Sequence, residues 1–199
     1  MSQPVILASG SAVRRQLLAQ AGLDFEVSPA RIDEEGLRQA LEAEAAAPEE
    51  MAETLAAFKA SRIAEKRPEA LIIGCDQILA HRGRVLGKPA TPDDARSQLR
   101  MLRGGPHHLF SAVVIYDDLQ PLWRYVGKVT LTMRPFSDTF LDEYLERNWD
   151  SVRDSVGAYK LEEEGVRLFS KIEGDYFDVL GLPLLPLQTF LTTRGVLLA

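Results

Sequence analysis

The alternation of apolar and polar positions along the chain predicts a strand, a turn and a helix at its start. Residues 4–8 form a short apolar run that ends in the small polar turn 9–11. Apolar residues then recur at helical spacing from Val13 to Ala21, and Gly22 ends this helix. A second strand is expected at 25–27.

The middle of the chain predicts two helices and then a buried strand. Residues 37–66 are rich in Ala, Glu and Leu and contain no Gly, and Pro48 is expected to separate two helices there. The apolar run 71–74 predicts a strand that ends before Cys75, Asp76 and Gln77.

The second half continues this alternation of strands and helices. A helix capped by Thr91 or Asp93 is expected to run to about Arg103, and another from Ser137 to Asn148. The remaining expected elements are strands at 109–116, 122–133 and 166–173 and a final helix through Gln188 and Leu191. The pattern indicates an α/β protein, and no linker divides residues 1–199, so we expect one domain.

Charge and cysteine content exclude several classes of function. The chain carries 23 Lys and Arg against 29 Asp and Glu, a formal net charge of −6, so it lacks the basic surface of a nucleic-acid-binding protein. Cys75 is the only cysteine, which excludes an intrachain disulfide and a thiolate metal cluster. There is no secretory signal pattern and no apolar segment of the roughly 20 residues that a membrane helix needs. We expect a cytoplasmic protein without membrane contact.

Several polar residues could bind phosphate. The turn of Ser9, Gly10 and Ser11 precedes a helix, where free N–H groups favour an anion, and Arg14 lies on the first turn. The alternative is an ordinary N-cap serine with an exposed arginine. Lys59 and Lys88 could neutralise phosphate charge, or could be surface lysines.

Two carboxylates could carry the chemistry. Asp76 follows an apolar strand, at the end of a sheet where ligands usually bind, and could hold a metal or orient water; it could also form a turn. Glu34 offers a second carboxylate, or belongs to the solvated surface. Cys75 is expected to be a buried, inert thiol, the histidines lack metal-ligand spacing, and residues 162–164 are expected to be solvated. Together the carboxylates and cations indicate Mg²⁺-dependent phosphate-ester chemistry.

The chain resembles the Maf family over nearly its whole length. The matching segments, in order, are LASGS at 7–11, DE at 33–34, LAAFKA at 55–60, IIGCDQ at 72–77, LGKP at 86–89, GAYKLE at 157–162 and IEGDYFDVLGLPL at 172–184. The resemblance implies a two-lobed α/β fold, with a mixed twisted sheet, flanking helices and a central cleft, similar to inosine-triphosphate pyrophosphatase. It also implies a homodimer.

The resemblance further implies hydrolysis of a nucleoside triphosphate to a monophosphate and pyrophosphate, with Mg²⁺. Asp76 would accept the proton of the attacking water, and Glu34 would help it to hold the metal. The remaining polar positions, which would bind the phosphates, are Ser9, Arg14, Lys59 and Lys88.

The base-recognition positions resemble the branch that hydrolyses 7-methyl-GTP. That branch has the same combination as this chain, a Gln after the Asp, here Gln77 after Asp76, and a Glu at the position of Glu162. Glu162 could accept hydrogen bonds from guanine and would favour a base made cationic by methylation. Val13 would also contact substrate, although that branch has tryptophan there. The alternatives are an enzyme acting on dTTP and UTP, and a nucleotide-binding regulator of cell division with little turnover.

Overall fold

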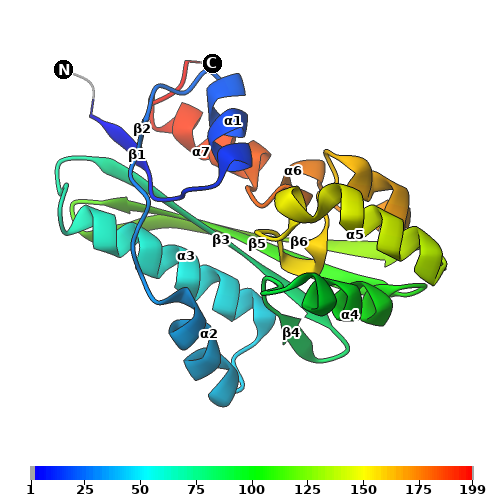
Figure 1. The fold of residues 1–199 in the computed structure, drawn as a ribbon. Helices are drawn as coiled ribbons and strands as arrows, with labels where there is room; N and C mark the ends of the chain where they lie inside the picture. Colours follow the sequence, from blue (N-terminus) through cyan, green and yellow to red (C-terminus); the bar gives the residue numbers. More distant parts are fainter. Residues whose placement is uncertain (1–2, 199) are drawn as a thin grey trace.

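A seven-stranded mixed sheet forms the centre of the computed structural model, which describes residues 3–198 (Figure 1). The strand order is β2-β1-β3-β5-β6-β7, and β4 also pairs with β3. Strand β1 pairs in parallel with β2 and β3, and the other pairings are antiparallel. The strands are β1 (Val5–Leu7), β2 (Glu26–Val27), β3 (Leu71–His81), β4 (Arg84–Leu86), β5 (Pro106–Asp117), β6 (Gln120–Met133) and β7 (Phe169–Glu173).

Helices cover both faces of this sheet, which confirms the predicted α/β class. Figure 1 shows α1 and α7 above one end of the sheet, α5 above the other end, α6 between them, and α3 beneath. The helices are α1 (Ala12–Gln20), α2 (Glu34–Ala43), α3 (Pro48–Ala64), α4 (Pro92–Leu102), α5 (Asp138–Val152), α6 (Tyr176–Val179) and α7 (Leu184–Thr193), with 3-10 turns at Val156–Ala158 and Glu164–Leu168. Within residues 3–198, no helix is long and apolar enough to cross a membrane.

Odd-numbered residues of β3 and β5 face α1, α5 and α7, because side chains alternate along a strand. At one end, Leu71 and Ile73 pack with α1 and α7 in one apolar cluster. At the other end, Leu79 and Leu109 pack with α4 and α5 in a second cluster. Between the two clusters this face is polar: Gln77 of β3 and Ser111 of β5 lie opposite each other in register. The two clusters are the cores of two lobes, and Gln77 and Ser111 lie on the floor between them.

Even-numbered residues of β3 face α3, which lies very close to the sheet. A Cβ atom on Gly74 would lie 2.2 Å from the Ala56 carbonyl oxygen and 2.8 Å from Ala60 Cβ. Only glycine fits at this distance. The next residue on this face is Asp76, which the close approach brings beside α3.

The edge of β3 is left open by its two short neighbours. Strand β1 pairs with β3 only as far as Ile73, and β4 begins to pair at Leu79. Residues 74–78 therefore have no strand partner on this side. Because no strand occupies this edge, side chains from both faces of β3 line one cavity there.

Three predicted elements were placed incorrectly. Strand β3 does not end at Gly74 but continues to His81, because antiparallel pairing with β5 extends it; Asp76 thus lies in mid-strand rather than at the strand end. The strand predicted at 166–173 begins only at Phe169, since Glu164–Leu168 is a 3-10 turn. Helix α5 continues past Asn148 to Val152.

Other local predictions are confirmed. Pro48 is the first residue of α3 and separates it from α2. Thr91 caps α4: its hydroxyl accepts from the Asp94 N–H, while the Asp94 carboxylate accepts from the Thr91 N–H.

Gly74→Ala tests the close approach of α3. The added methyl group forces helix and strand apart, so we expect a loss of about 1–3 kcal/mol in the free energy of unfolding. Gly105→Ala is the matched control, because a Cβ there meets no atom within 4 Å. Chemical denaturation of both variants checks this, and equal stability of the two would contradict the packing described.

Candidate active site

A cavity of about 660 Å³ opens at the uncovered edge of β3, between the two lobes. It brings together every residue that the sequence nominated for binding or catalysis. These lining residues are Ser9, Val13, Arg14, Glu34, Lys59, Asp76, Gln77, Lys88 and Glu162.

Lys59 joins the two candidate carboxylates. Its Nζ lies 2.9 Å from Asp76 Oδ1 and 3.0 Å from Glu34 Oε1. Lys59 and Asp76 are 6% and 9% exposed, whereas Glu34 is exposed. Lys59 is therefore not a surface lysine. Its ammonium group holds the Asp76 carboxylate in place through a contact with one of the two carboxylate oxygens, Oδ1.

The turn of residues 9–11 and the start of α1 form a second wall. Ser11 is the N-cap, and its hydroxyl accepts from the Arg14 N–H, as the capping interpretation predicts. Arg14, however, is buried rather than exposed. Its Nε donates to the Gly181 carbonyl at 2.7 Å, and its Nη1 donates to the Cys75 carbonyl at 2.9 Å and to Ser9 Oγ at 3.3 Å. Arg14 thus ties α1 to the open edge of β3 and contributes positive charge to the cavity.

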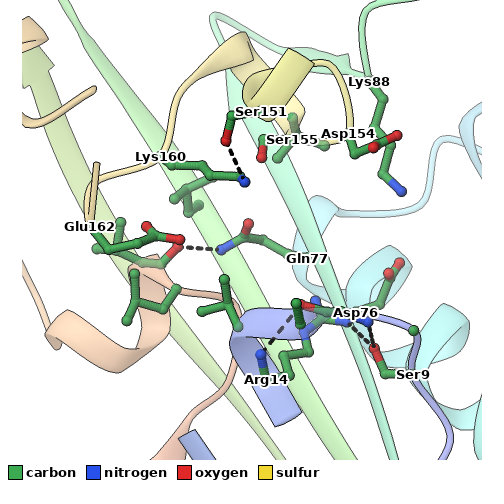
Figure 2. Close-up of a pocket in the computed structure, with 18 of the residues that line it drawn as sticks. Ser9, Arg14, Asp76, Gln77, Lys88, Ser151, Asp154, Ser155, Lys160 and Glu162 are labelled. Atoms are coloured by element: carbon green, nitrogen blue, oxygen red, sulfur yellow. Dashed lines mark hydrogen bonds between the residues drawn. The ribbon is translucent and has the colours of Figure 1, made fainter. Parts of the chain in front are cut away.

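Gln77 forms part of the floor in a fixed orientation. Its Nε2 donates to Ser111 Oγ at 2.9 Å and to the carbonyls of Asp178 and Val179 at 3.0 Å each. Carbonyl partners identify this atom as the amide nitrogen. In Figure 2 the opposite end of the amide, Oε1, points toward the side of the cavity that holds Lys160.

The far wall comes from the end of α5 and the segment that follows it. Lys160 Nζ donates to Ser151 Oγ at 2.8 Å and pairs with Glu163 at 3.2 Å. Glu162 lines the cavity with no hydrogen bond or ion pair to any residue in the range 3–198. Figure 2 places Lys88 beside Asp154, across the cavity from Ser9.

A family model described as Maf-like protein matches residues 4–194. The chain belongs to the Maf-like family. It is 55% identical over 195 residues to "Nucleoside triphosphate pyrophosphatase" of Roseobacter denitrificans, covering 98% of each chain. It is 53% identical over 197 residues to the protein of that name from Ruegeria sp. (strain TM1040), and 45% identical over 197 residues to "7-methyl-GTP pyrophosphatase" of Mesorhizobium japonicum, covering 99% of each chain in both comparisons.

The donor set of this Maf-like chain fits a magnesium ion that substrate helps to bind. Mg²⁺ is usually held by one or two carboxylates together with substrate phosphates. Glu34 and Asp76 supply two carboxylates that already meet at one ammonium. In the part of the chain that the structure describes, no group of three or more His, Cys, Asp or Glu could hold a metal by itself.

Sequence reasoning missed part of the far wall. Asp150, Ser151, Asp154 and Ser155 line the cavity, but the predicted helix ended before them. The segment GAYKLE, which matches the family, could have predicted this wall, because it contains Lys160, which lines the cavity.

Two further expectations have clear outcomes. Cys75 is fully buried, and burial raises the pKa of its thiol to about 11, which confirms an inert thiol. Residues 162 and 163 are exposed, as expected for a solvated run, whereas Glu164 is only partly exposed. The Glu164 carboxylate accepts from Arg147, Asn148 and Arg167, which lowers its pKa to about 2.

Asp178, whose carbonyl holds Gln77, predicts a pH-dependent stability. Its side chain is 5% exposed, and burial raises its pKa from 3.8 to about 6. The folded protein therefore binds this proton more tightly than the unfolded chain, so stability falls as pH rises from about 4 through about 6. We expect Asp178→Asn to remove that fall. The difference in the free energy of unfolding between this variant and the wild type should shift by about 1–3 kcal/mol in favour of the variant between pH 4 and pH 8.

Thermal unfolding across this pH range measures the effect. Asp24→Asn, at an exposed position without a polar partner in the described chain, is the control and should follow the wild-type curve. An Asp178→Asn curve parallel to wild type would show that Asp178 does not titrate in this range.

Proposed function

We propose that this chain hydrolyses a nucleoside triphosphate to a monophosphate and pyrophosphate, and that its substrate is a base-modified purine nucleotide such as 7-methyl-GTP. One observation carries the proposal. A single cavity joins cations and two carboxylates at the β3 edge to a separate polar wall with Gln77, Lys160 and Glu162. A triphosphate and its base can occupy these two parts at the same time.

The phosphates would bind between the start of α1 and the cations. The N–H groups of Ala12 and Val13, in the first turn, have no partner within their helix and point toward the helix N-terminus. The buried guanidinium of Arg14 adds a fixed positive charge there, and Lys88 faces the same space from the opposite side. These groups are prearranged to stabilise negative charge on transferring oxygens.

Asp76 would act as the general base. Lys59 holds Oδ1, so Oδ2 is available to accept a proton from water. The water oxygen attacks the α-phosphorus, its proton passes to Asp76, and the bond from that phosphorus to the bridging oxygen breaks. Pyrophosphate leaves with the bonding electron pair. A magnesium ion held by Glu34, Asp76 and the phosphates would supply charge neutralisation at the reacting phosphate.

The base would lie against the far wall. Glu162 has no partner among the described residues, so its carboxylate can accept from the N1–H and exocyclic amine of guanine. Its charge also favours a cationic, N7-methylated base. Gln77 Oε1 offers a further acceptor on the floor. The relatives named 7-methyl-GTP pyrophosphatase, at 45% and 46% identity, support this substrate class.

The competing substrate is a pyrimidine triphosphate, dTTP or UTP. A regulator of cell division with little turnover is a weaker candidate, since all the cations and carboxylates that hydrolysis needs are gathered in one cavity. The magnesium ion, the homodimer and the cytoplasmic location stay predictions.

Asp76→Asn tests the general base. Loss of the proton acceptor should lower kcat about 10²- to 10⁴-fold, whereas substrate binding should change little. Pyrophosphate release measures turnover, and Asp142→Asn is the control, because this exposed carboxylate of α5 pairs with Arg96 and does not line the cavity. Near-normal turnover of Asp76→Asn would remove Asp76 from this role, and orthophosphate as the only inorganic product would refute the reaction.

Glu162→Gln tests the base site. Removal of the negative charge should lower the preference for 7-methyl-GTP over UTP and dTTP by about tenfold, because charged hydrogen bonds to guanine are lost. The preference over GTP should fall as well, because the attraction between the carboxylate and the cationic base is lost. The ratio of kcat/KM values across this set is the measurement. A ratio equal to that of the wild type would show that Glu162 does not contact the base.

A further inference from the structure

The segment that carries Lys160 and Glu162 is held to the rest of the lobe at three points. Tyr144 Oη donates to the Ala158 carbonyl at 3.2 Å. The hydroxyl of Tyr159 shares a hydrogen bond of 2.8 Å with Nε2 of His107 on β5. Lys160 itself donates to Ser151, as described above. Each successive residue from 158 to 160 thus has its own anchor.

The backbone of this segment needs such anchors. Gly157 and Ala158 are consecutive residues with left-handed φ values of 77° and 57°. A non-glycine residue rarely adopts this conformation, and it persists only where the surroundings hold it. Gly157 also has no room for a side chain, since a Cβ atom would lie 2.6 Å from Leu79 Cδ1 and 2.7 Å from Tyr159 Cε1.

His107 is the deepest of these anchors. It is 1% exposed, and its ring packs against those of Tyr159 and Phe169 at centroid distances of 5.6 and 6.0 Å. Burial lowers its pKa to about 3, so the imidazole is neutral at physiological pH. His107 does not line the cavity, whereas Tyr159 does. Tyr159 is thus a cavity-lining residue that His107 contacts directly.

We propose that His107 and Tyr159 are positioning residues for base selectivity, because their hydrogen bond sets where Lys160 and Glu162 stand relative to Gln77. This inference rests on the proposed base site. The hydrogen bond joins the sheet, which holds Gln77, to the segment that bears Glu162. Within this lobe, the buried contact is the anchor that ties the segment directly to β5, and so to the sheet that forms the floor of the base site.

Tyr159→Phe removes the hydrogen bond and keeps the ring in place. We expect the preference for 7-methyl-GTP over UTP to fall about fivefold, mainly through a higher KM for 7-methyl-GTP, as a net hydrogen bond of this kind predicts. His107→Gln, which leaves Tyr159 itself unchanged, should give a loss of the same kind. Tyr116→Phe, a matched change elsewhere with no hydroxyl partner among the described residues, should leave the preference at its wild-type value.

A double-mutant cycle separates positioning from general packing. If Tyr159 acts by placing Glu162, Tyr159→Phe should change the preference little in a Glu162→Gln background. Equal losses in both backgrounds, or a lower melting temperature with an unaltered preference, would overturn the inference. If Glu162→Gln alone has no effect, the base site is wrong and the inference falls with it. If Glu162→Gln has its effect but Tyr159→Phe does not, only the inference fails.

Discussion

The open edge of β3 is the constraint on which the rest of this Maf-like structure depends. Because β1 stops pairing at Ile73 and β4 starts at Leu79, residues 74–78 have no strand partner along that edge. Asp76 from one face and Gln77 from the other can thus line one cavity, although neighbouring residues of a strand normally point apart. In the proposed reaction, the general base and a base-recognition residue are therefore consecutive along the chain.

Close packing of α3 supplies the partner that this arrangement needs. Gly74 admits the helix, and one alternation further along β3 Asp76 meets Lys59 at 2.9 Å. A buried ion pair is weak evidence for stability, since removal of both charges from water costs several kcal/mol. In this structure the ion pair determines geometry: the Lys59 ammonium orients the Asp76 carboxylate and also contacts the Glu34 carboxylate. The same contact therefore organises the part of the cavity where we propose that the phosphates bind.

Local signals in the sequence predicted most elements, and the structure places every nominated site residue in one cavity, but the contacts among these residues were not predicted. Pro48 and the Thr91 cap are read from single positions, so their helices were placed well. The end of β3 was misplaced because the pairing that extends it depends on a distant strand: residues 75–80 pair with residues 108–113 of β5. Burial of Arg14 was missed for the same reason, since its acceptors at Cys75 and Gly181 are distant along the chain.

The central claim is that Asp76 directs water to the α-phosphorus of a nucleotide lying along this cavity. Hydrolysis in water labelled with a heavy oxygen isotope, followed by mass spectrometry of both products, tests it most directly. The account predicts the label in the nucleoside monophosphate and none in pyrophosphate. Label in the pyrophosphate would mean that water attacks the β-phosphorus, and would contradict the placement of Asp76 and the phosphate-binding cations described for this cavity.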